Sequence, residues 1–164
     1  MTLTVLFTFI PTALVTITMP KISNVENKSQ RIKYTVQSFW FVLATGIMLY
    51  ILIFFFGKFA LGMTFTEKYV LSYPILLVLS VGAIFNGLRS VFCALWVGSG
   101  HPIITVYDIA CASAVCITLS FLLIPSMGPI GAAYGYTLGL IAAVLVDLIY
   151  WIKYKYTESL NLEG

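Results

Sequence analysis

The sequence predicts an all-α fold, a polytopic membrane helix bundle with five transmembrane helices. Of its 164 residues, 60% are hydrophobic and only 9% are charged, and the mean hydropathy is +1.01. A soluble domain averages about 25% charged residues, so this chain has too few to cover a water-facing surface. The charged residues also divide the chain into apolar runs close to the roughly 20 residues that one membrane span needs.

The first three apolar runs are separated by polar residues. The first span is predicted over 1–20, before the polar segment KISNVENKSQRIK. The second, 34–57, ends in IFFFG and precedes an interfacial segment. The third, 73–97, begins beside Pro74, and proline is favoured in the first turn of a helix.

The last two spans share one uncharged stretch between Asp108 and Asp147, which is too long for a single span. The fourth span is predicted over 103–124, after the turn GSGHP. The turn PSMG (Pro125–Gly128) is expected to break the stretch, and the fifth span is predicted over 129–152. The two spans should therefore form a tight antiparallel hairpin.

Lysine and arginine residues predict the orientation. One side of the predicted bundle carries Lys21, Lys28, Arg31, Lys33, Lys153 and Lys155. The other side carries Lys58 and Lys68. The positive-inside rule then places the first loop and the C-terminus in the cytoplasm. The organisation expected is a transmembrane bundle over 1–157 and a short polar cytoplasmic tail over 158–164.

The loop between the first two spans is the predicted contact with the membrane surface. Its basic residues suit anionic lipid headgroups better than nucleic acid, because they form one short segment beside a span. They are Lys21, Lys28, Arg31 and Lys33. In this orientation the first span runs from outside to inside, so we expect the chain to be the C-terminal part of a larger protein.

Three ionisable residues lie inside predicted spans: Arg89, Asp108 and Asp147. Each costs about 2.5–3.5 kcal/mol at a helix centre on insertion scales, so such residues usually face a bundle interior and have partners. At about 1.5 Å per residue, all three lie roughly 8–12 Å from the cytoplasmic ends of their spans. Pairing of either aspartate with Arg89 and coupling to an ion or proton are both open interpretations.

A polar stripe surrounds Arg89 on its helix. Asn86 and Ser90 lie on the same side, together with Gly82 and Cys93. Because guanidinium binds phosphate in a bidentate manner, Arg89, Asn86 and Ser90 are candidates for contact with an anionic substrate. The alternative is a buried ion pair that holds the spans together.

Small residues recur every four positions in the fifth span, at Gly131, Gly135, Gly139 and Ala143. Such a row lets another helix approach closely, which matters because lipid provides no hydrophobic drive for helix association. Packing within the bundle, a contact that slides during a transport cycle, and homodimerisation are the three interpretations.

The remaining motifs argue against several classes of function. Cys93, Cys111 and Cys116 lie in apolar runs without the histidine spacing of a zinc site, so no metal or cofactor is expected. Paired carboxylates, a DxD motif and a nucleophile–base set are absent from the sequence, so an enzyme is not expected. Nucleic-acid binding has no support.

Several segments together resemble polysaccharide and O-antigen flippases of the polysaccharide transporter family, in the multidrug/oligosaccharidyl-lipid/polysaccharide exporter superfamily. MPKIS (19–23) resembles the family's P-x-(I/L)-S at the end of a span. ALWVGSGHP resembles its small-residue turn, and FLLIPSMGPIGAAYGYTLG resembles its liP.yGiiGAA stretch. Each motif is degenerate, and their order carries the resemblance, which covers nearly the whole chain.

The resemblance implies a five-helix portion of the C-terminal lobe of a two-lobed exporter. Such proteins flip undecaprenyl-diphosphate-linked oligosaccharide across the bacterial cytoplasmic membrane by alternating access. The implied partners are membrane lipids, the lipid-linked oligosaccharide, an N-terminal lobe that this chain lacks, and polysaccharide assembly proteins. Two alternatives remain open. One is an accessory subunit docking through Gly131, Gly135 and Gly139, and the other is a small membrane enzyme that processes polysaccharide.

Overall fold

Four long helices form the part of the chain that the structure describes. The computed structural model describes residues 28–64 and 73–162, and it describes side-chain surroundings for 29–57 and 73–155. The helices are α2 (Lys28–Thr64), α3 (Tyr73–Gly98), α4 (Ile103–Met127) and α5 (Pro129–Leu162). Each contains a segment long and apolar enough to cross a membrane. The protein is therefore an all-α, multi-pass membrane bundle.

The number of spans supported by the structure is four, whereas the sequence predicts five. The predicted span over 1–20 lies outside the described residues. The other four predicted spans each correspond to one helix. Many large apolar side chains on these helices are exposed, including Phe55 and Phe121. Lipid is the solvent in which this surface is stable.

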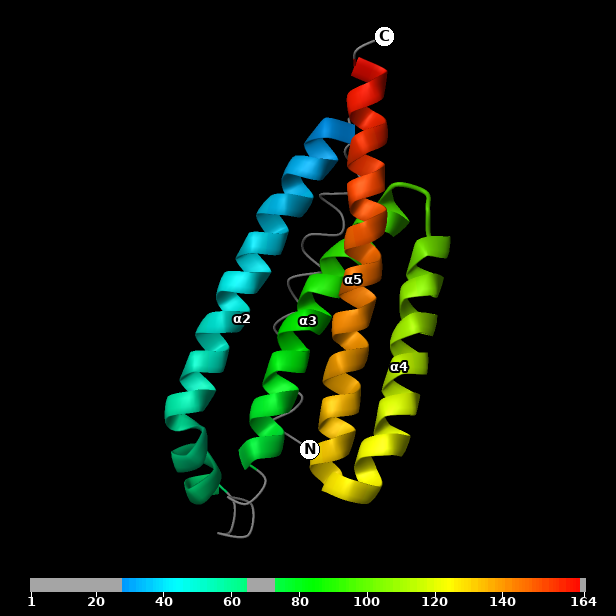
Figure 1. Ribbon diagram of the computed structural model, residues 1–164. Helices are drawn as coiled ribbons and strands as arrows, with labels where there is room; N and C mark the ends of the chain where they lie inside the picture. The colour runs from blue at the N-terminus through cyan, green and yellow to red at the C-terminus, as the bar shows by residue number, and fades with distance from the viewer. Residues whose placement is uncertain (1–27, 65–72, 163–164) are drawn as a thin grey trace.

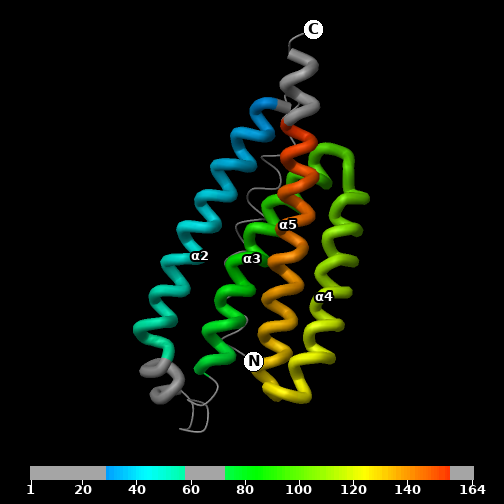
Figure 2. The backbone as a smooth tube through the Cα atoms, viewed as in Figure 1, coloured from blue at the N-terminus to red at the C-terminus, as the bar shows by residue number. Residues whose placement is uncertain are grey.

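The helices alternate in direction and lie in the order α2, α3, α5, α4 across the bundle (Figure 1, Figure 2). The last helix, α5, packs along both α3 and α4, while α2 packs along α3. The predicted hairpin of the fourth and fifth spans is confirmed. The start of α2, the α3–α4 turn and the end of α5 lie at one end of the bundle, at the top of Figure 1.

The central helix α3 supplies most of the buried core. Its fully buried residues include Leu95 and Trp96. Residues from α2, α4 and α5 complete the same cluster, which consists of Val42, Leu88, Val91, Phe92, Ala94, Leu95, Trp96, Ile104 and Val144. This core therefore packs α2, α4 and α5 against α3. It lies in the half of α3 that leads to the α3–α4 turn.

The turn between α3 and α4 is closed by a Schellman motif. Gly100 has φ +79°, a conformation in which glycine avoids the strain of a side chain. The amide of His101 donates to the carbonyl of Trp96 at 2.8 Å, and that of Gly100 to Val97 at 3.2 Å. These bonds satisfy the carbonyl groups at the end of α3, so α4 begins at once.

The turn between α4 and α5 is shorter than the sequence predicts. Pro125 lies inside α4, which continues to Met127 instead of ending at Ile124. A proline in the last turn removes only one helical hydrogen bond, and that loss does not end the helix. Gly128 ends it, because its φ of +63° reverses the chain directly into Pro129.

The basic segment before the second span is also more helical than predicted. Helix α2 begins at Lys28, so Arg31 and Lys33 lie on its first turns and not in a loop, while Lys21 lies outside the described residues. A helix satisfies its own backbone hydrogen bonds, which favours continuation into the interface. The same helix continues beyond Gly57 to Thr64, and α5 continues beyond 152 to Leu162.

The glycine row of α5 packs against the backbone of α4. A Cβ atom added at Gly131 would lie 2.5 Å from the Leu123 carbonyl oxygen, and one at Gly139 would lie 2.7 Å from that of Ala112. A Cβ atom at Gly135 would collide with Ser120, and Ala143 is fully buried. This contact within the chain covers the face that a docked partner subunit would need.

Interhelical hydrogen bonds also join α3 to α5 and to α2. The Thr137 hydroxyl of α5 donates to the Val78 carbonyl of α3 at 3.1 Å, beside Gly82. The Tyr73 hydroxyl donates to the Phe54 carbonyl of α2 at 2.8 Å. Hydrogen bonds of this kind between membrane helices contribute roughly 0.6 kcal/mol each.

We expect Gly131→Ala to lower the free energy of unfolding by about 1–3 kcal/mol, the usual size of an overpacking effect, because the added methyl group meets rigid backbone. The matched control is Gly46→Ala, whose Cβ atom would lie 3.0 Å from the Ile84 side chain and would meet no backbone of a neighbouring helix. SDS titration in mixed micelles measures both. Equal losses in the two variants would contradict the tight α4–α5 contact.

Candidate functional site

Arg89 of α3 and Asp108 of α4 form an ion pair inside the bundle. Arg89 Nε donates to Asp108 Oδ2 at 3.0 Å, and Arg89 Nη2 lies 3.4 Å from Asp108 Oδ1. The Asp108 side chain is fully buried, while that of Arg89 is 18% exposed. The two helices otherwise make few direct contacts, so this bidentate pair is an important link between them.

Asp147 of α5 is the second buried carboxylate of this region. Its Oδ1 accepts a hydrogen bond of 2.8 Å from Trp96 Nε1, and both side chains are almost fully buried. Its Oδ2 has no hydrogen-bond partner in the part of the chain that the structure describes. The direct partner of Asp147 is therefore a neutral indole rather than Arg89.

The three ionisable residues belong to one cluster. Asp147 interacts electrostatically with both Asp108 and Arg89. The Cys93 side chain, one helical turn from Arg89, also lies within electrostatic range of all three. We call Arg89, Trp96, Asp108 and Asp147 the charged cluster. One cation thus serves two buried carboxyl groups.

The other two predicted substrate-contacting residues lie beside Arg89 without bonding to it. Ser90 is half-buried, and its hydroxyl donates to the Asn86 carbonyl of its own helix at 2.8 Å. Asn86 is also half-buried. A contact of these side chains with an anionic substrate stays a prediction.

Trp96 is the member of the cluster that sequence analysis missed. It lies seven residues after Arg89, which is two turns along the same face of α3. An indole N–H inside an apolar helix needs an acceptor. Because Trp96 and Arg89 lie on the same helix face, the acceptor for Trp96 is expected on the helices that also face Arg89. Helical periodicity alone could therefore have placed Trp96 near the buried carboxylates.

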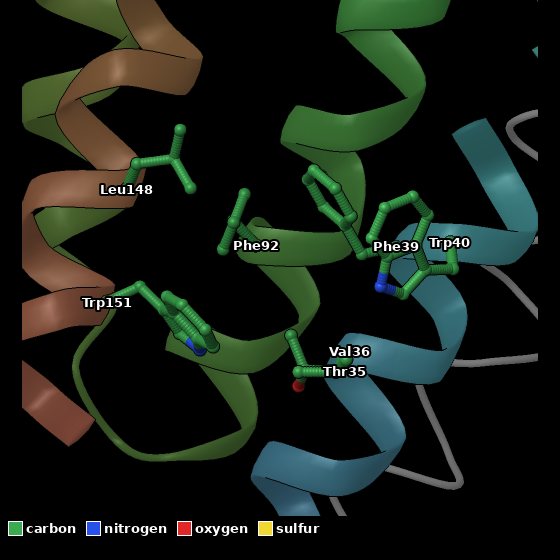
Figure 3. Close-up of a pocket in the computed structure, with 7 residues that line it drawn as sticks. All are labelled: Thr35, Val36, Phe39, Trp40, Phe92, Leu148 and Trp151. Atoms are coloured by element: carbon green, nitrogen blue, oxygen red, sulfur yellow. The ribbon is translucent and has the colours of Figure 1, made fainter.

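A separate apolar groove lies between α2, α3 and α5. It encloses about 210 Å³ and is lined by Thr35, Val36, Phe39, Trp40, Phe92, Leu148 and Trp151. Figure 3 shows side chains of α2 facing those of α5, with Phe92 of α3 between them. The Phe92 ring lies 5.8 Å from that of Phe39 and 6.5 Å from that of Trp151, measured between centroids. We call these seven residues the aromatic groove.

We expect Arg89→Met to lower the free energy of unfolding by about 3–5 kcal/mol, because it leaves the buried Asp108 carboxylate without its cation. The double variant Arg89→Met/Asp108→Leu should lose much less, since both charges are removed together. SDS unfolding compares the two. A double variant as unstable as the single one would show that the pair does not link α3 and α4.

Replacing Trp96 by phenylalanine removes the indole donor to Asp147. A buried acceptor left without its donor costs about 1–3 kcal/mol, so we expect a loss of that size in unfolding free energy. Trp40→Phe is the control, because Trp40 is 64% exposed. Thermal unfolding in detergent, followed by circular dichroism, separates them. A Trp96→Phe variant that unfolds like Trp40→Phe would argue against the bond.

Comparison with known proteins gives no family for this chain. No protein-family model, no curated protein and no solved structure matches it. The structure therefore shows a bundle of four long apolar helices that are candidate membrane spans.

Proposed function

We propose that this protein is part of a flippase that moves undecaprenyl-diphosphate-linked oligosaccharide across a membrane by alternating access. The order of the motifs MPKIS, ALWVGSGHP and FLLIPSMGPIGAAYGYTLG supports the proposal. The multi-pass bundle is compatible with it. In this role the protein is a transporter rather than an enzyme, and it serves O-antigen or another surface polysaccharide.

The charged cluster is the observation that carries the proposal. An ionisable residue inside a membrane span is costly, so it is a functional candidate by default. Arg89 keeps 18% of its side chain exposed while its partner Asp108 is fully buried. Guanidinium binds carboxylate and phosphate with the same bidentate geometry. A substrate diphosphate can therefore take the place of Asp108 on Arg89 without leaving the cation unpaired.

Exchange at Arg89 gives the two aspartates a role. When phosphate replaces the Asp108 carboxylate, Asp108 loses its cation while Asp147 keeps only its neutral donor Trp96. Two carboxylates close together in a dry region favour uptake of a proton or cation. Asp108 and Asp147 thereby couple substrate binding to an ion. The glycine row of α5 is the surface along which α4 slides as the bundle changes state.

The proposed location is the bacterial cytoplasmic membrane, with the C-terminus in the cytoplasm. The basic residues at the start of α2 and the end of α5 support this orientation, because they lie at the same end of the bundle (Figure 1). The partners are membrane lipids, the lipid-linked oligosaccharide, the N-terminal lobe of the exporter and polysaccharide assembly proteins.

The test uses the full gene product in proteoliposomes that carry a fluorescent lipid-linked oligosaccharide in both leaflets. A membrane-impermeant reductant bleaches the outer leaflet, and further bleaching reports flipping. We expect flipping above protein-free vesicles, and a rate at least about tenfold lower for Arg89→Lys, since lysine retains the charge but not the bidentate geometry. Phe41→Leu is the control and should keep the wild-type rate, because Phe41 is exposed and lies outside both the charged cluster and the aromatic groove.

Two results would contradict the proposal. Wild-type protein that flips no faster than empty vesicles would remove the transport function. Arg89→Lys that retains the full rate, at matched protein levels and with intact folding, would remove Arg89 from the mechanism.

A further inference from the structure

We propose that the aromatic groove holds one acyl chain of an anionic glycerophospholipid, whose phosphate group binds Arg31 of α2 and Lys155 of α5. The proposal does not rest on the flippase function. It concerns the groove between α2, α3 and α5, which has its own lining residues.

The geometry of the groove suits a hydrocarbon chain. Both α2 and α5 pack along α3 but make little or no direct contact with each other, so they form two walls with Phe92 between them (Figure 3). The volume of about 210 Å³ exceeds the roughly 150 Å³ of an apolar cavity that takes up benzene. A segment of an acyl chain therefore fits.

The lining is mostly apolar: its polar atoms are one hydroxyl group and the indole N–H groups of Trp40 and Trp151, of which Trp151 Nε1 has no hydrogen-bond partner among the described residues. Thr35 contributes the only hydroxyl group of the lining, and that hydroxyl already donates to the Arg31 carbonyl at 2.8 Å. A lining this poor in polar groups favours a hydrocarbon chain over water. In a membrane, the apolar molecule always present at high concentration is the lipid itself.

Two cations mark the end of the groove where a headgroup would lie. Arg31 precedes the lining residue Thr35 by one helical turn, and Lys155 follows the lining residue Trp151 by one turn. Because α2 begins and α5 ends at the same end of the bundle, both turns lead toward the same side (Figure 1). Lys155 Nζ lies 5.7 Å from the centroid of the Trp151 ring, which places this cation directly beside the groove.

The surrounding residues place this end at headgroup depth. Trp40 and Trp151 line the groove, while Tyr154 packs edge-on against Trp96 just beyond it. Tryptophan and tyrosine gather at membrane–water interfaces, where lysine and arginine also extend toward the headgroups. One turn of helix, about 6 Å, separates the apolar lining from the two cations along the axis. That spacing matches a lipid whose chain lies inward and whose phosphate lies at the surface.

The experiment is native mass spectrometry of the full chain released from nanodiscs with equal amounts of phosphatidylglycerol and phosphatidylcholine of the same acyl composition. The expected result is one retained phosphatidylglycerol per protein. Removing one cation should lower the apparent affinity of the protein for phosphatidylglycerol about fivefold. The double variant Arg31→Gln/Lys155→Gln should therefore bind this lipid about 25-fold more weakly than wild type. The matched control is Lys58→Gln/Lys68→Gln, which removes the same charge from the other predicted side of the bundle and should retain the lipid.

A second variant tests the chain-binding part of the site. Val36→Trp fills the groove from α2 and should reduce retention of both lipids, with its melting temperature in detergent confirming that it folds. Three outcomes would overturn the proposal. They are equal retention of the two lipids by wild type, equal losses in the two double variants, and displacement of phosphatidylglycerol by an equimolar polyisoprenyl phosphate.

Discussion

The close contact between α4 and α5 determines where the charges of this protein meet. Glycine residues on α5 bring its backbone against that of α4, with Gly131 beside Leu123 and Gly139 beside Ala112. Continuing this antiparallel register by one or two turns brings Asp147 to the level of Asp108, in agreement with their electrostatic interaction. A larger side chain in the row would separate the helices and remove Asp147 from the cluster.

The helix α3 turns this pair of helices into a site. It supplies the cation for Asp108 and the indole donor for Asp147, from positions two turns apart on one face. It also carries most of the buried core. Because lipid provides no hydrophobic drive for helix association, these polar contacts and the close backbone approaches define the arrangement. The same side chains therefore hold the bundle together and form its candidate functional site.

The charged cluster and the aromatic groove have different chemistry, and this difference separates the two proposals. Toward α4 and α5 the helix α3 presents the charged cluster, which is buried and suited to exchange of anions at Arg89. Toward α2 it presents Phe92, which leads into an apolar groove with cations at one end. A bilayer favours this division, because charges away from the surface need partners while apolar surface finds lipid chains.

The sequence by itself determined the class of the protein and the positions of its described spans. Composition and charge spacing predict a membrane bundle, and the hairpin of the last two spans follows from the uncharged stretch around Gly128. Helix ends were less predictable. Pro125 and the basic residues near Lys28 are tolerated in helices, because a helix in or near lipid satisfies its own backbone hydrogen bonds.

Only the tertiary structure decided which of the alternatives holds at each polar position. The spacing of Arg89, Asp108 and Asp147 allows either aspartate to pair with the arginine, since periodicity gives the face of a helix but not its neighbour. The insertion of α5 between α3 and α4 assigns Asp108 to Arg89 and Asp147 to Trp96. The same insertion covers the glycine row and opens the groove between α2 and α5. Helix order in a bundle depends on contacts distant in sequence, which is why these features required the structure.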